Sequence, residues 1–279
     1  MKKINLLVVL ALAATPAFLH AQTTSYSDVV GYNKISAPIG SSFQSFNFVN
    51  EDLFQGVVGS VSGNTITLTG LSGVASNAWA PTDGLPDGEP VNIPQYYMEV
   101  TSGPLAGYNF DIVSNSGSQV TIDSAPAGLV GQGAVIRRHV SLGQIASTAS
   151  GLTSNVDSAT IFNPDGTQLD VSWDGANWVD LNNFVYGDAY VIYPGVGFAL
   201  NSAGVVNLNQ SGLVKKTPTV VSVFNGAVNI VSTMNPQVGV AITLGAANFG
   251  EFLVKNADTL STFSTVAQQL QVEYDTLLS

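Results

Sequence analysis

Residues 157–174, DSATIFNPDGTQLDVSWD, and residues 258–275, DTLSTFSTVAQQLQVEYD, carry one pattern twice and indicate the fold. Aligned without gaps, the two stretches are identical at six positions, and Trp173 stands opposite Tyr274. The identical pairs are Asp157/Asp258, Phe162/Phe263, Gln168/Gln269, Leu169/Leu270, Val171/Val272 and Asp174/Asp275. The repeat indicates that a β unit of about a hundred residues starts a second time. We expect residues 258–279 to be an incomplete second copy of it.

The residues on either side of the first copy predict short strands joined by tight turns. A turn at Asp174–Asn177 would place Trp173 opposite Trp178 on neighbouring strands. Nearer the N-terminus, Gly63-Asn64 separates two runs of alternating residues, which is the clearest hairpin signal of the chain. No segment shows sustained helical periodicity. The pattern predicts an all-β fold of two antiparallel domains, each of the small barrel or sandwich type.

The boundary between these domains is predicted within Leu142–Val156, which is small, polar and rich in Ser, Thr, Ala and Gly. Residues 22–145 would form the N-terminal β domain, and residues 146–257 the C-terminal one.

The N-terminus has the features of an export signal. Lys2 and Lys3 precede an apolar run, Ile4–Ala14, that is too short to span a bilayer, and Ala21 offers a small residue for cleavage. We therefore expect residues 1–21 to be removed and the mature chain to be extracellular or at the cell surface, with the periplasm as the alternative. The mature chain would have no membrane span.

Charge and cysteine content exclude several classes of function. Loss of Lys2 and Lys3 takes the formal net charge from −11 to −13, so nucleic acid and anionic lipid surfaces are not expected as partners. The chain has no cysteine, which excludes disulfides, thiolate nucleophiles and thiolate metal sites. Only 10% of the residues are charged, and the abundance of Gly, Ser, Thr, Asn and Val suits short strands with tight turns.

Several stretches resemble an uncharacterised family of secreted, β-rich bacterial proteins that often occur as many copies in one genome. They are VVGYNKISAP (29–38), FQGVVGSVSGNTITLTG (54–70), YYMEVTSGPLAGYNFDI (96–112), YPGVGFAL (193–200), SGLVKKTPTVVSV (211–223) and AVNIVSTMNPQVGVAITL (227–244). The resemblance covers most of the mature chain and implies export and a β fold. It implies no activity. The sequence departs from the family by ending where similar proteins continue, so we expect a fragment of a longer protein, with pairing of the C-terminal strand in trans as the alternative.

The residues that enzymes need are scarce. His139 is the only histidine left after export, and we interpret it as a polar residue at a strand end rather than as a catalytic base. No G-x-S-x-G nucleophile motif occurs. A secreted polysaccharide hydrolase would need paired carboxylates across a cleft, and the acids near Asp83–Glu89 are the candidates. This is the weakest of the functional hypotheses.

Clustered acids on predicted loops also suggest calcium. Asp83, Asp87 and Glu89 form one cluster, and Asp165 and Asp174 belong to another near the Trp hairpin. Carboxylate oxygens on loops are the ligands that Ca²⁺ takes, although no EF-hand spacing is present. The alternative interpretation is that the Asp-Gly pairs simply form turns. Calcium is the only cofactor that the sequence suggests.

Four aromatic residues give the best ligand hypothesis. Trp173, Trp178, Tyr190 and Tyr193 fall within one short region, and exposed rings stack well against sugars. The alternative is that they belong to the core, which the Trp173/Tyr274 match in the repeat favours.

Together these observations predict an exported, non-enzymatic β protein of the cell surface or extracellular matrix, with a structural or adhesive role. A carbohydrate-binding module is the alternative. Polysaccharides, other envelope proteins and a second copy of the chain are the expected partners.

Overall fold

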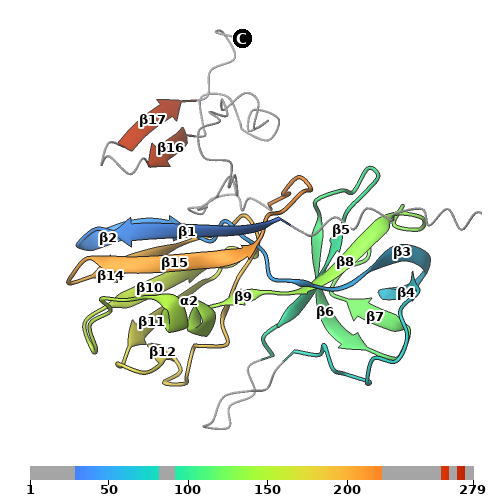
Figure 1. Cartoon of the computed structure of the whole chain (residues 1–279), viewed down its shortest axis with the longest axis horizontal. Helices are drawn as coiled ribbons and strands as arrows, with labels where there is room; N and C mark the ends of the chain where they lie inside the picture. The colour runs from blue at the N-terminus through green and yellow to red at the C-terminus, as the bar shows by residue number, and fades with distance from the viewer. Residues whose placement is uncertain (1–28, 82–91, 222–258, 264–268, 274–279) are drawn as a thin grey trace, which may run out of the picture.

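The computed structural model describes residues 29–81 and 92–221, together with the backbone of 259–263 and 269–273. Within these residues the chain is mostly antiparallel β-structure with one short helix. The prediction of a mainly β, antiparallel protein is therefore confirmed. Figure 1 shows two bodies, a barrel on the right and a group of sheets with the helix α2 on the left.

The barrel is closed by six antiparallel strands in the order β3-β4-β7-β6-β5-β8. Their bounds are β3 (Asp52–Ser62), β4 (Thr65–Thr69), β5 (Tyr96–Val100), β6 (Asn109–Asn115), β7 (Gln119–Ile122) and β8 (Gly133–Arg138). The predicted hairpin is confirmed: Ser62 pairs with Thr65 across Gly63-Asn64, and Gly63 has the positive φ of 57° that this turn requires. In β4, Ile66 and Leu68 alternate with threonines and lie in the barrel core.

The second body, called the sheet unit below, surrounds its own core. Its main sheet has the order β12-β11-β10-β14-β2, and the ribbon β1-β15, the pair β9-β13 and the helix α2 complete it. The bounds are β1 (Val30–Ala37), β2 (Gly40–Ser45), β9 (Val140–Ser141), α2 (Leu142–Thr148), β10 (Ser158–Phe162), β11 (Gln168–Trp173), β12 (Trp178–Asp180), β13 (Val191–Ile192), β14 (Gly197–Ser202) and β15 (Val206–Leu213).

The first two strands of the chain belong to the sheet unit rather than to the barrel. Strand β2 pairs with β14, and β1 pairs with β15 from Val30↔Leu213 to Ala37↔Val206. The chain then builds the barrel and returns through β9. The boundary predicted between residues 145 and 146 falls inside α2. It leaves β1 and β2 within the predicted N-terminal domain, although these strands pair with β15 and β14.

The helix α2 lies where the sequence predicts a small, polar linker. Ser141 is its N-cap and accepts a hydrogen bond from the backbone N–H of Gln144 at 3.2 Å. Leu142 and Ile145, one turn apart, are its buried residues. Two apolar positions are too few to show a helical period, which is why the sequence pattern does not reveal this helix.

The sequence repeat corresponds to a repeated hairpin. Strand β10 pairs with β11 from Ser158↔Ser172 to Phe162↔Gln168. Strands β16 (Thr259–Phe263) and β17 (Gln269–Glu273) pair from Thr259↔Glu273 to Phe263↔Gln269. Each residue of the second hairpin therefore pairs as its counterpart in the first does. The absence of helical periodicity in the sequence agrees with the two strands described here.

Several predictions fall on residues that the structure does not describe. They concern the signal peptide at 1–21 and the acidic loop with Asp83, Asp87 and Glu89. In the described ranges, no helix combines the length and the apolar character that a membrane span requires.

Candidate functional site

The aromatic cluster predicted as a sugar platform is largely interior. Trp173 pairs with Trp178 across β11 and β12, as predicted, and their ring centroids are 5.4 Å apart in an edge-to-face arrangement. Trp178 and Tyr190 are each only 2% exposed, and Trp173 and Tyr193 pack, partly buried, against the same core. Trp178 and Tyr190 offer no ring face to a sugar, which fits the alternative interpretation that these rings belong to the core. Strand alternation turns both tryptophans toward the core, together with Val171.

Asp180 is the polar centre of this region. Its carboxylate is fully buried and accepts hydrogen bonds from the backbone N–H groups of Asn182 at 2.7 Å and Asn183 at 3.0 Å. The Tyr190 hydroxyl donates to the second carboxylate oxygen. Burial acts to raise the pKa of Asp180, but the hydrogen bonds from Tyr190, Asn182 and Asn183 outweigh it and hold the pKa below its ordinary value.

These bonds shape a loop at the end of β12, residues Leu181–Phe184, called the tip loop below. Val185 closes it, since the Asp180 N–H donates to the Val185 carbonyl at 2.8 Å. Phe184 is 79% exposed and has a positive φ of 57°. The sequence analysis missed this residue, because a positive φ at a phenylalanine leaves no mark in the pattern LNNF. The only available signal was a large apolar residue after two asparagines.

The acids predicted near the Trp hairpin are used by their own turns. Asp165 accepts hydrogen bonds from the Thr167 N–H at 2.9 Å and from its hydroxyl at 2.6 Å. Asp174 accepts from the N–H groups of Ala176 and Asn177, both at 2.7 Å. These bonds lower the pKa of both carboxyl groups, and the arrangement fits the turn-forming interpretation.

Only one of the two predicted calcium clusters lies within the described residues. Asp83, Asp87 and Glu89 lie outside the described residues. Over the ranges that the structure does describe, no three His, Asp or Glu side chains come together as a metal site.

His139 lies where the barrel meets the sheet unit, directly after the end of β8 as predicted, and its side chain is buried. Its Nε2 lies 3.0 Å from Asp111 Oδ1, and the Tyr193 hydroxyl donates to Asp111 Oδ2 at 2.9 Å. The rings of Tyr97 and Tyr193 stand 4.5 Å and 5.0 Å from the imidazole, centroid to centroid. Burial and the charge of Asp111 raise the pKa of Tyr193, so its hydroxyl stays protonated and donates.

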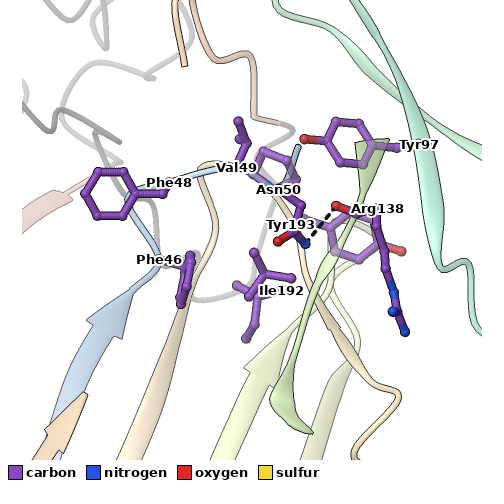
Figure 2. A pocket seen from close by; sticks show the side chains of 10 residues that line it. Phe46, Phe48, Val49, Asn50, Tyr97, Arg138, Ile192 and Tyr193 are labelled. Carbon is purple, nitrogen blue, oxygen red and sulfur yellow. Dashed lines mark hydrogen bonds between the residues drawn. The ribbon is translucent and has the colours of Figure 1, made fainter. Parts of the chain in front are cut away.

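The imidazole of this His-Asp pair is enclosed by the protein. A carboxylate on one imidazole nitrogen is the arrangement that orients a general base, whose other nitrogen takes the proton. Here that nitrogen, His139 Nδ1, is buried and finds no hydrogen-bond partner within the described part of the chain. The adjacent cavity (Figure 2), lined by Asn50, Tyr97 and Tyr193 among others, measures about 10 Å³. That is the room of about one water molecule.

A second contact between the two bodies is the strap, residues 214–221, which follows β15. Lys215 is buried, and its Nζ lies 2.8 Å from Glu99 Oε1 on β5. The other Glu99 oxygen pairs with Arg137 of β8, whose Nε bonds to Asp52 at 2.6 Å. Two acids and two bases therefore balance one another in the interior, as buried charges require. Burial lowers the pKa of Lys215, while Glu99 acts against this shift.

The strap also rests on the barrel through its backbone. The Val220 N–H donates to the Gly107 carbonyl at 3.2 Å. Gly107 has a φ of 95°, and a Cβ there would lie 2.6 Å from the Pro218 carbonyl oxygen. Only glycine allows this approach.

Comparison with known proteins adds no assignment: no family model, no curated protein and no solved structure matches the chain.

Proposed function

We propose that this chain is an exported, non-enzymatic β protein of the cell surface or extracellular matrix, with a structural or adhesive role. The observation that carries the proposal is the use of the buried charges. Glu99, Arg137 and Lys215 join the strap to the barrel, Asp180 shapes the tip loop, and Asp157 ties two loops together by accepting from Thr153 and Ala203 N–H groups. Each buried charge is thus used to hold parts of the chain together.

The sequence supports the same proposal from a different side. The export signal expected at residues 1–21 supports a location outside the cytoplasm, where the acidic, cysteine-free composition is suitable. The resemblance to secreted, multi-copy β proteins points to the same compartment. The recurrence of the hairpin β10–β11 as β16–β17 supports a chain assembled from repeated β units, which suits a structural role.

Localisation in the bacterium that encodes the protein tests the proposal. An epitope tag inserted in the exposed turn after Ser116 would be expected to label intact cells or the culture medium, and external protease would remove it without lysis. A cytoplasmic marker enzyme serves as the control for leakage. Retention of the tagged chain with that marker would contradict the proposal.

Carbohydrate binding is a second candidate function, and one observation favours it. The aromatic rings that the sequence analysis predicted to bind sugar are mainly interior. Phe184, which was not among them, is the most exposed large apolar side chain of the described residues.

A further inference from the structure

The tip loop combines an exposed ring with a backbone that resists movement. The backbone of Phe184 is fixed, because its N–H donates to the Asp180 carbonyl at 3.0 Å. The preceding Asn182 and Asn183 are fixed by the Asp180 carboxylate. A loop whose backbone is anchored in this way loses little conformational freedom when it meets a ligand.

Phenylalanine is an unfavourable residue for the backbone conformation and the exposure at position 184. A positive φ of 57° is the left-handed conformation, which glycine and asparagine adopt readily and phenylalanine does not. Exposure at 79% also leaves the ring without the burial that usually accompanies an aromatic residue. Strained backbone that the surrounding structure enforces is found at binding sites more often than elsewhere. The loop would fold better with another residue, which points to a use for the ring.

The surroundings of the ring define the ligand. Asn182 and Asn183 are exposed beside it. The Asn183 amide nitrogen donates one hydrogen bond to Asp180, which leaves its second N–H and its oxygen, together with the Asn182 amide, as partners for sugar hydroxyls. The exposed Asp170 lies next to the loop, because the Leu181 N–H donates to the Asp170 carbonyl at 2.9 Å. Its carboxylate repels anionic polymers. One ring and Leu181, 48% exposed, are too small an apolar area for a stable protein interface, which needs about 800 Å² per partner.

We propose that the tip loop, Leu181–Phe184, binds neutral polysaccharide, with a sugar ring stacked on Phe184 and its hydroxyl groups on Asn182 and Asn183. This proposal deepens the adhesive role described above and rests on it, since it names the surface and the class of ligand.

Retention of the purified full-length chain on insoluble polysaccharide tests the proposal. The probes are cellulose and chitin, which are neutral, and crosslinked alginate, which is acidic. The wild-type chain is expected to be retained on at least one neutral probe and not on alginate. Phe184→Ala removes the ring and should weaken retention about tenfold. Phe184→Gly should weaken it equally and raise the melting temperature, because glycine accepts the positive φ without strain.

Phe43→Ala is the matched control, since Phe43 on β2 is also exposed, at 41%, but has an ordinary φ. It should leave retention unchanged. The proposal is overturned if no neutral probe retains the wild type, if alginate does so equally, or if Phe43→Ala weakens retention as much as Phe184→Ala. It is also overturned if Phe184→Ala alters only the oligomeric state in light scattering. Because the assay uses purified protein, its outcome is independent of the localisation experiment.

Discussion

Aspartate side chains have two different structural roles in this protein. Asp165 and Asp174 are exposed and form turns, as their Asp-Gly sequences predict. Asp157 and Asp180 are fully buried and connect separate segments. The sequence cannot tell these roles apart, because an aspartate at either end of a strand favours a turn whether its side chain faces inward or outward. The repeat did single out Asp157, although its identity with Asp258 could not show that it is buried.

Replacing Asp180 tests the inward role. Asp180→Asn puts an amide NH₂ opposite donors from Asn183 and Tyr190, so we expect a loss of about 1–3 kcal/mol in the free energy of unfolding at pH 7. The measurement is urea denaturation.

The same comparison predicts a pH dependence. Because the folded-state pKa of Asp180 is lowered, its stabilisation is complete above the unfolded-state pKa, whose ordinary value is 3.8. It is lost as the pH falls through the folded-state value. The gap between wild type and Asp180→Asn should therefore narrow below about pH 4. A gap that stays constant down to the acid transition would show that the charge of Asp180 contributes nothing.

At the scale of elements, local pairings were predictable and distant ones were not. The β3–β4 hairpin and the pairing of Trp173 with Trp178 follow from turn residues and alternation. The β1–β15 ribbon joins residues from opposite ends of the described body, and no local signal marks it. Trp178 is buried in the core of the sheet unit, to which α2 and β14 also contribute residues, and neither element could be positioned from the sequence. Because Trp178 is buried, the exposed ring of this region is Phe184, which the sequence did not indicate.

The β11–β12 hairpin should depend strongly on Trp178. Trp178→Ala is expected to cost about 3–5 kcal/mol, because it leaves a cavity in the core of the sheet unit. Trp178→Phe should cost clearly less, since the indole Nε1 has no hydrogen-bond partner among the described residues. Urea denaturation of both variants gives the comparison. Equal losses would show that the Nε1 group, rather than ring volume, matters at this position.

At the scale of the whole molecule, polar contacts join the barrel to the sheet unit. His139, Asp111 and Tyr193 form one such contact, and the strap with Lys215 and Glu99 forms another. Both are made by residues far apart in the sequence, so composition and spacing could not reveal them.

The strap contact can be tested through Lys215. Lys215→Met leaves Glu99 buried with less compensation, and we expect a loss of about 3–5 kcal/mol in unfolding free energy. The double variant Lys215→Met/Glu99→Gln should lose less than the sum of the two single changes. Lys216→Met, at the exposed neighbouring position, is the control and should change stability by about 0.5 kcal/mol or less. A small effect at Lys215 would show that the strap is not held by this pair.

The ribbon β1–β15 has a consequence for mechanics. Val30, where the chain enters the described body, pairs with Leu213, where it leaves for the strap. A pull applied at Val30 and at Val221, the last described residue of the strap, would first lift the strap and Lys215 from the barrel. It would then unzip the ribbon one pair at a time from Val30↔Leu213, instead of shearing all its hydrogen bonds at once. Bonds loaded singly yield at low force. The described body therefore lies beside the line of tension and not along it. This arrangement suits a protein that presents a surface better than one that bears a load.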